Sequence, residues 1–147
     1  MRPTVKVKKL DARAILPTYG SEYAAGADLY ALADAPITIE AGATVLIKTG
    51  LCMEIPEGYA GLIYARSGLA SKKGLAPANK VGVIDADYRG EIMVALHNHS
   101  DVSAEVAPSE RVAQLAIVPF LKAEFDVVDE LSDTVRGTGG FGSTGTK

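Results

Sequence analysis

Apolar and polar residues alternate over short stretches along most of the chain, which is the pattern of strands with one buried face. Val5 and Val7, for example, are each followed by a lysine. Comparable runs occupy residues 37–40, 44–48, 51–55, 60–65, 80–85, 91–98, 112–120 and 124–128. Because glycines and prolines separate many of these short runs, the pattern predicts an all-β fold of the β-sandwich, jelly-roll or barrel type.

Residues 67–74, SGLASKKG, are typical of a short helix instead. Ser67 is a suitable N-cap and Gly74 a suitable C-terminal stop, so we expect about two helical turns between them. The N-terminus of this helix would then lie beside Arg66.

The composition changes near residue 132. Residues 136–147 read RGTGGFGSTGTK and contain five glycines, and such a segment cannot bury enough apolar surface to order itself. We therefore predict one β domain over residues 1–131 and a mobile arm over residues 132–147. The arm nevertheless carries Arg136 and Phe141, which a simple spacer would not need.

Charge and cysteine content narrow the function classes. The 15 basic and 18 acidic residues give a net charge of −3, which argues against nucleic-acid binding but not against a small anionic ligand. Cys52 is the only cysteine, so an intrachain disulfide is impossible and a reducing compartment is favoured. No run has the ~18 apolar residues of a membrane span, and no signal peptide is evident. We expect a cytoplasmic protein with no membrane partner.

Two stretches offer polar groups for phosphate chemistry. Arg66-Ser67-Gly68 would stand at a helix N-terminus, where N–H groups and a guanidinium can bind an anion. The alternative is an ordinary capped helix beside a surface arginine. In GVIDADYRGEI, residues 82–92, Asp85 could deprotonate a water and Tyr88 could pack on a sugar. The alternative is a common Asp- and Gly-rich hairpin turn.

Two polar residues stand in apolar surroundings. Asp28 lies in AGADLYA and needs partners if it is buried, either as a turn cap or as an organiser of a site. Gln114 lies in an apolar strand, where it needs buried partners unless the strand is at an edge. The pattern GxGxxG at residues 140–145 does not predict a dinucleotide site, because no helix follows it. His97 and His99 alone do not make a zinc site.

Five stretches occur in the order AGADLYA, ARSGLA, NKVGVIDADYRGEI, ERVAQL and RGTGGFGSTG. In order and spacing they resemble the motifs of the trimeric dUTP diphosphatase (dUTPase) family, from about Ala25 to Gly145. The resemblance implies a jelly-roll fold that forms a homotrimer with active sites shared between subunits. It also implies that the arm closes over the nucleotide in the site of a neighbouring subunit.

The implied reaction is dUTP plus water giving dUMP and pyrophosphate. It limits uracil incorporation into DNA and supplies dUMP for thymidylate synthesis. Mg²⁺ is the implied cofactor, held by the triphosphate and by waters, with no direct protein ligand expected.

The resemblance assigns roles residue by residue within the β domain. Asp85 matches the catalytic aspartate that activates the attacking water, and Tyr88 matches a ring that packs on deoxyribose and excludes a ribose 2′-hydroxyl. Asp28 matches an acidic residue that organises the subunit contact and the waters near the metal. The other matched residues are Asn79, Val83, Ile84 and Met93 at the uracil, and Arg66, Ser67, Gly68 and Gln114 at the phosphates.

In the arm, Phe141 matches a ring that stacks on uracil, and Arg136 matches a guanidinium that pairs with the γ-phosphate. Glycines such as Gly142 let backbone N–H groups approach phosphate oxygens without interference from a Cβ. Ser143 and Thr144 can donate further hydrogen bonds. A segment that is mobile when free and ordered when bound would act as a lid that excludes water.

Two alternative functions fit the same fold. A dCTP deaminase-like enzyme would need a glutamate acid/base beside the pyrimidine, where this hairpin offers Asp85. A non-enzymatic nucleotide-binding or signalling module would be favoured by loss of the catalytic aspartate or of the arm, and the sequence has both.

Overall fold

The computed structural model describes residues 2–142 of the chain. Over these residues the chain forms short strands and one helix. In chain order the elements are β1 (Lys6–Lys9), β2 (Thr18–Tyr19), β3 (Ala27–Tyr30), β4 (Ile37–Ile39), β5 (Thr44–Glu54), β6 (Tyr59–Tyr64), α1 (Ser67–Lys73), β7 (Leu75–Pro77), β8 (Gly82–Ile84), β9 (Glu91–Asn98), β10 (Ala104–Val106) and β11 (Arg111–Pro119). Within this part of the chain, no helix has the length and apolar character needed to cross a membrane.

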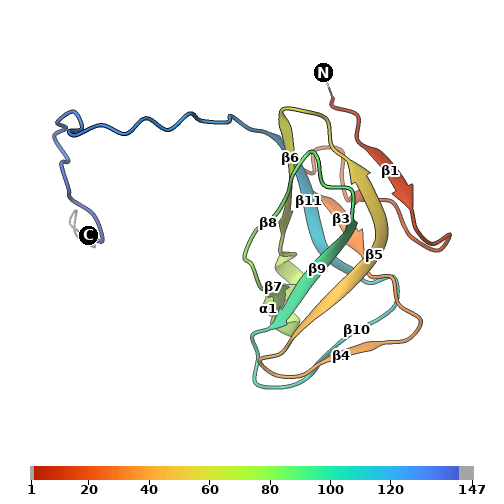
Figure 1. The fold of residues 1–147 in the computed structure, drawn as a ribbon. Helices are drawn as coiled ribbons and strands as arrows, with labels where there is room; N and C mark the ends of the chain where they lie inside the picture. The colour runs from red at the N-terminus through yellow and green to blue at the C-terminus, as the bar shows by residue number, and fades with distance from the viewer. Residues whose placement is uncertain (1, 143–147) are drawn as a thin grey trace.

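The strands form two larger antiparallel sheets and one two-stranded ribbon (Figure 1). One sheet has the order β1-β5-β9-β7, the other has the order β2-β3-β11-β6-β8, and β4 pairs with β10. Most neighbours within a sheet are distant in sequence, so the chain crosses repeatedly between the sheets, as it does in a jelly roll. The predicted all-β fold with one short helix is therefore confirmed over the described residues.

The hydrophobic core lies between the two larger sheets and is built from alternating strand positions. In β9, Ile92, Val94 and Leu96 are buried, whereas Met93 between them is partly exposed. Val112 and Leu115 of β11 face the same core from the other sheet. The alternation that buries Ile92 and Val94 thus leaves Met93 on the outer surface of its sheet.

The helix α1 begins one residue earlier than predicted. Ser67 is the first helical residue, Arg66 occupies the N-cap position, and no side-chain hydrogen bond caps the helix. The prediction of Ser67 as the N-cap is therefore wrong. Gly74 ends the helix as predicted, because its φ of 66° lies in the left-handed region and its N–H reaches the carbonyls of Ala70 and Leu69.

The prediction of a strand over residues 124–128 is wrong for this chain. β11 ends at Pro119, and the described residues from 120 to 142 form no helix or strand. Leu121, Phe125 and Val127 alternate as strand residues do, but each is more than 90% exposed. This segment leads away from the β-sheets (Figure 1), so it has no strand partner within its own chain. The boundary of the arm at residue 132 stays a prediction.

Candidate active site

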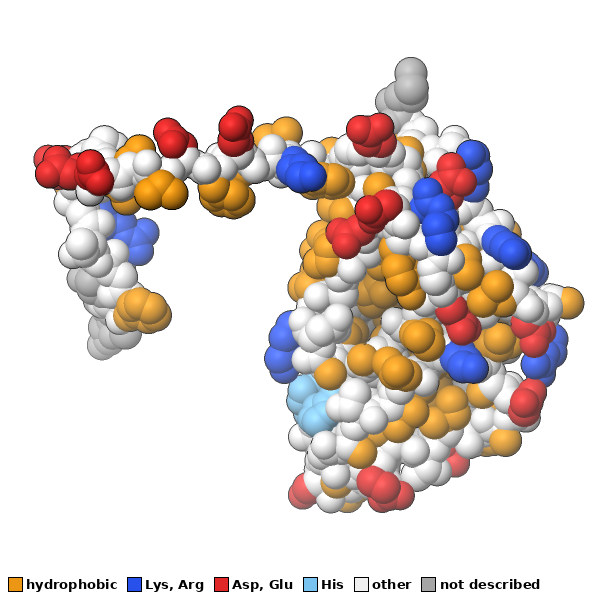
Figure 2. Space-filling model, in the orientation of Figure 1, with side chains coloured by type: hydrophobic (Ala, Val, Ile, Leu, Met, Phe, Trp, Pro, Cys, Tyr) orange, Lys and Arg blue, Asp and Glu red, His pale blue; other side chains and the backbone are white. Residues whose placement is uncertain are grey.

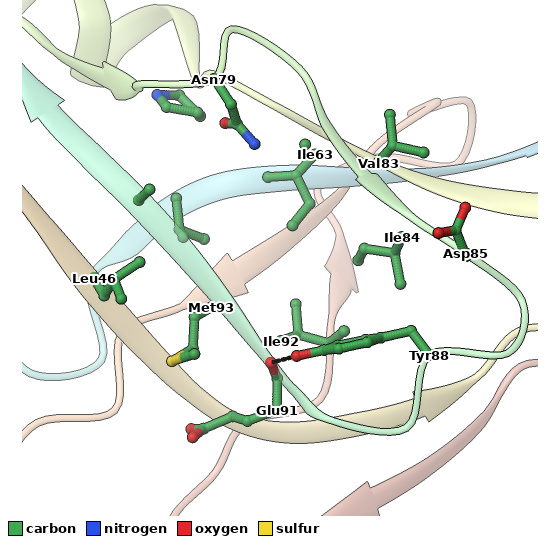
Figure 3. A pocket seen from close by; sticks show the side chains of 14 residues that line it. Leu46, Ile63, Asn79, Val83, Ile84, Asp85, Tyr88, Glu91, Ile92 and Met93 are labelled. Atoms are coloured by element: carbon green, nitrogen blue, oxygen red, sulfur yellow. Dashed lines mark hydrogen bonds between the residues drawn. The ribbon is translucent and has the colours of Figure 1, made fainter.

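The loop between β8 and β9 forms one wall of a cavity of about 320 Å³ (Figure 3). The prediction of a hairpin here is wrong, because β8 pairs with β6 in one sheet and β9 pairs with β5 and β7 in the other. Other parts of the lining come from β5, β6 and the loop before β8, and apolar side chains predominate. Figure 2 shows apolar side chains gathered on the face of the molecule over β5 and β9. Among the residues that line the cavity are Asn79, Val83, Ile84, Asp85, Tyr88 and Met93, all of which the sequence analysis singled out.

The alternation of β8 sets the directions of the side chains at this cavity. Ile84 is buried, whereas Val83 beside it is 64% exposed. Asp85 follows directly after the strand and is exposed, so water can reach its carboxylate. Leu46 of β5 also lines the cavity. Sequence analysis did not predict Leu46, because an apolar residue in an alternating strand carries no sign of a binding role.

Hydrogen bonds fix the turn that carries Tyr88. The Tyr88 hydroxyl donates to the backbone carbonyl of Glu91 over 3.0 Å, a bond that is drawn in Figure 3. Arg89 donates from Nη1 to the carbonyls of Ala86, at 2.6 Å, and Tyr88, at 3.1 Å. The ring and the turn therefore hold each other in place before any ligand binds.

A second polar cluster surrounds Asp28, which is only 9% exposed. Its Oδ1 accepts a hydrogen bond from Nε of Arg66 at 2.8 Å, and its Oδ2 accepts one from Nη1 of Arg111 at 3.2 Å. Two guanidiniums thus compensate one buried carboxylate, which satisfies the requirement that a buried charge be paired. The contact between Arg111 and Asp28 was not predicted from the sequence.

Gln114 lies beside Asp28 in the register of β11 against β3. Its Nε2 donates to the carbonyl of Ala65 at 2.8 Å, so it holds the residue that precedes Arg66. A Cβ on Gly26 would lie 2.7 Å from Oε1 of Gln114, which makes the absence of a side chain at Gly26 necessary for this arrangement. Gln114 therefore contacts the backbone at the start of the predicted phosphate segment.

The C-terminal end of α1 is held by a further ion pair. Nζ of Lys73 lies 2.7 Å from Oε1 of Glu110 and donates to the carbonyl of Glu105 at 2.8 Å. Burial raises the pKa of Glu110, but hydrogen bonds from Lys73 and from the N–H of Ala107, with the nearby positive charges, lower it to below its usual value. Together with the buried side chain of Leu69, this pair fixes the helix against the β-sheets.

Asp85 and Arg66 lie at opposite ends of the β6–β8 pair. Gly61 pairs with Ile84, so Asp85 lies near Ala60 at the start of β6, whereas Arg66 follows the end of β6. At ~3.3 Å per residue, this separation along the strand is roughly 20 Å. The structure therefore brings together the predicted uracil and catalytic residues in one place and Asp28, Arg66 and Gln114 in another.

The predicted arm residues lie apart from both clusters within this chain. Phe141 is fully exposed, and Arg136 donates from Nε to the carbonyl of Gly139 at 2.7 Å. Gly142 is also exposed. The remaining two predicted arm residues, Ser143 and Thr144, lie outside the described residues.

The acidic residues of the described chain do not gather into a cation site. Within residues 2–142, no three of the His, Cys, Asp and Glu side chains lie close enough together to hold a metal ion. The Asp28 carboxylate is already engaged by Arg66 and Arg111. This donor set fits an ion that would take most of its ligands from a bound nucleotide and from water, rather than one held by the protein alone.

The fold and the cavity place the chain among jelly-roll proteins with a pocket beside a loop that connects the two sheets. Residues 12–145 match the family model described as dUTPase, which spans most of the chain. The chain therefore belongs to the dUTPase family.

Individual relatives agree with this assignment. The chain is 46% identical over 142 residues to the deoxyuridine 5'-triphosphate nucleotidohydrolase of Syntrophotalea carbinolica, and the match covers 97% of each chain. It is 51% identical to the protein of the same name from Thiobacillus denitrificans, covering 95% of this chain and 97% of the relative. The solved structure of the Staphylococcus bacteriophage 80alpha dUTPase with dUPNHPP is 32% identical, covers 97% of this chain and 99% of that one, and superimposes with a TM-score of 0.88.

The Asp28 cluster generates a stability prediction. Asp28→Asn should lower the free energy of unfolding by roughly 2–3 kcal/mol, because Arg66 and Arg111 would lose their shared counter-charge. Urea denaturation at fixed protein concentration measures this loss. Asp34→Asn is the matched control, since Asp34 pairs with Arg13 through a side chain that is 88% exposed. A loss at position 28 no larger than that of the control would contradict a stabilising role of the cluster.

Proposed function

We propose that this protein hydrolyses dUTP to dUMP and pyrophosphate. The observation that carries the proposal is the cavity at the β8–β9 loop. It is lined by the accessible carboxylate of Asp85, the partly buried carboxylate of Glu91, the anchored ring of Tyr88 and the side-chain amide of Asn79. Membership of the dUTPase family and the names of the relatives support the choice of substrate. The reaction would limit uracil incorporation into DNA and supply dUMP for thymidylate synthesis, in the cytoplasm.

Asp85 is the proposed general base. Its carboxylate would accept a proton from a water as that water attacks the α-phosphorus. The bond between the α-phosphorus and the oxygen bridging to the β-phosphorus would break, and pyrophosphate would leave. The position of Asp85 at the end of β8, exposed and on the wall of the cavity, suits a residue that must reach both water and nucleotide.

The rest of the cavity is suited to uracil and deoxyribose. The Asn79 amide and the backbone of β8 at Val83 and Ile84 offer donors and acceptors for the edge of uracil, and Met93 of β9 would pack against the base. A cytosine in the same place would leave polar groups unpaired, and mismatches of this kind can discriminate by roughly 10⁴-fold. The Tyr88 ring would pack on the sugar.

The phosphates would be bound by Arg66, Ser67, Gly68 and Gln114. Arg66 and Asp85 are separated along β6 within one chain, so we infer that a complete site combines the β8–β9 loop of one subunit with the phosphate segment of another. This arrangement agrees with the proposed homotrimer with shared sites. The Asp28 cluster would then present Arg66 to the nucleotide of the neighbouring subunit.

The segment after β11 supports the same assembly. Leu121, Phe125 and Val127 lie on alternate positions and are almost fully exposed in the single chain. Exposed apolar side chains of this kind favour docking against another copy of the chain. From such a position the arm could reach the site of a neighbour, where Phe141 would stack on uracil and Arg136 would pair with the γ-phosphate. Gly142, Ser143 and Thr144 would add hydrogen bonds to the phosphates.

Mg²⁺ is the proposed cofactor, bound with the triphosphate and waters. When bound it would neutralise part of the triphosphate charge, which eases attack by water on phosphorus. The protein would add the guanidiniums of Arg66 and Arg136 to the same task.

Pyrophosphate release from dUTP, dCTP, dTTP and UTP with Mg²⁺ tests the proposed function. We expect release from dUTP and little from the other three, because the proposed site would match uracil and exclude the 2′-hydroxyl. No release from any nucleotide would refute the hydrolase and favour a binding module. Ammonia released from dCTP would instead indicate a deaminase.

Asp85→Asn should lower kcat for dUTP by roughly 100-fold to 10⁴-fold while dUTP still binds, because only the proton acceptor is lost. Steady-state kinetics and calorimetric titration with dUTP measure the two effects. Asp87→Asn is the matched control, since Asp87 is exposed on the same turn and does not line the cavity. A kcat close to that of the unaltered protein in Asp85→Asn would remove Asp85 from the role of base.

A stop after Val135 should leave the β domain folded and assembled but lower kcat/KM for dUTP roughly 100-fold or more, because the lid that aligns the triphosphate is gone. Thermal unfolding and gel filtration check the fold and the assembly. In the full chain, Phe141→Trp introduces the only tryptophan, whose fluorescence should change when dUMP binds. Full activity of the shortened chain would refute the lid.

A further inference from the structure

We propose that Gly90 is a specificity-determining position, because the absence of a side chain there keeps the Tyr88 ring where it excludes a ribose 2′-hydroxyl. The inference rests on the proposed function, since it concerns the sugar of the nucleotide in the same cavity. Gly90 would contact neither the nucleotide nor the reacting atoms. It would act by determining the position of the Tyr88 ring.

The Tyr88 ring occupies the space that a side chain at position 90 would need. A Cβ on Gly90 would overlap the Tyr88 hydroxyl oxygen and would lie 2.6 Å from Cζ and 3.0 Å from Cε2. These contacts are closer than packed atoms allow, so a side chain at position 90 requires the Tyr88 ring or the turn to shift. The ring is therefore folded back against the backbone of its own turn.

The backbone conformation does not explain the glycine. Gly90 is not among the glycines with positive φ, unlike Gly50 or Gly58. An alanine could adopt the backbone angles at position 90 without entering the left-handed region. The three tightest contacts that a Cβ at this position would make are all with the Tyr88 side chain.

The group that anchors the ring is itself fixed. Tyr88 donates to the carbonyl of Glu91, and the Glu91 side chain accepts a hydrogen bond at Oε1 from the N–H of Gly50 at 2.9 Å. Gly50 lies in the irregular part of β5, with a φ of 70°, and a Cβ there would lie 2.7 Å from Leu32 and 2.9 Å from Ala14. Glu91 is thus tied to the core sheet and cannot follow a displaced ring.

A methyl group at position 90 must therefore displace the ring and break its bond to Glu91. Because Arg89 holds the turn through the carbonyls of Ala86 and Tyr88, rotation of the ring is easier than movement of the turn. A ring that leaves this position no longer closes the cavity at the sugar. The expected consequence is that a ribonucleotide is accepted more readily relative to a deoxyribonucleotide.

Gly90→Ala tests the proposal in the full-length protein. The quantity to measure is the ratio of kcat/KM for dUTP to kcat/KM for UTP. We expect this ratio to fall by roughly 10-fold to 100-fold, the range over which an apolar wall discriminates against one small group. Gly20→Ala is the matched control, because Gly20 is exposed and a Cβ there would have no atom within 4 Å. The control should keep the ratio of the unaltered protein.

A double-mutant cycle separates an effect through the ring from a general loss of structure. Tyr88→Ala should lower the ratio at least as far as Gly90→Ala does. The double variant should match Tyr88→Ala alone, because no ring remains for the methyl group to displace. A further fall in the double variant, or an equal loss of activity on dUTP and UTP in Gly90→Ala, would overturn the proposal.

Two further measurements keep the test decisive. If Gly90→Ala does not fold, Tyr88→Phe serves as the test, because it keeps the ring but loses the hydrogen bond to Glu91. Tyr88→Phe should lower the ratio by a smaller factor than is expected for Gly90→Ala, and an unchanged ratio would count against the proposal. Calorimetric affinities for dUMP and UMP report sugar discrimination without turnover. If the unaltered protein prefers dUMP but releases no pyrophosphate, the hydrolase proposal fails, and loss of that preference in Gly90→Ala would still support the role of Gly90.

Discussion

The buried carboxylate of Asp28 is the constraint on which one end of the molecule depends. It lies on β3 among small and apolar residues, where an ionised group needs compensation. Arg66, at the start of α1, and Arg111, at the start of β11, supply it. One charge thus ties together β3, β11 and the junction between β6 and α1. The same contact holds the Arg66 guanidinium in one orientation, which matters wherever a phosphate is to be bound by a planar donor.

The length of the β6–β8 pair has a consequence for the oligomer. Asp85 and Arg66 lie at opposite ends of that pair, roughly 20 Å apart along the strand, so a movement of either side chain cannot bring them together. In the proposed assembly, a nucleotide that needs both groups would lie between subunits. Each subunit would then supply the carboxylate of one site and a guanidinium of another.

The sequence predicts a strand well where buried residues repeat at every second position. It predicts poorly where a strand or a contact depends on residues that are distant in the sequence. The alternation of Ile92, Val94 and Leu96 identifies β9, because the core requires that pattern. Residues 124–128 alternate equally well, yet they form no strand in this chain because no partner strand is within reach. The contact between Asp28 and Arg111 joins residues 83 positions apart, and no local pattern could identify it. The prediction of Ser67 as the N-cap was wrong because Arg66, which is held by Asp28, occupies the N-cap position.

Glycines near the two clusters share a role that a sequence does not reveal. Glycines in a hairpin or before a strand are usually interpreted as turn formers, for their backbone freedom. At Gly26 and Gly90 the structure gives a different reason, because each leaves room for a polar side chain, Gln114 or Tyr88, to lie against the backbone. Each of these side chains donates a hydrogen bond to a main-chain carbonyl. The missing Cβ atoms therefore determine where the Gln114 and Tyr88 side chains lie. In the proposed site, the placement of both side chains would depend on residues that do not touch the nucleotide.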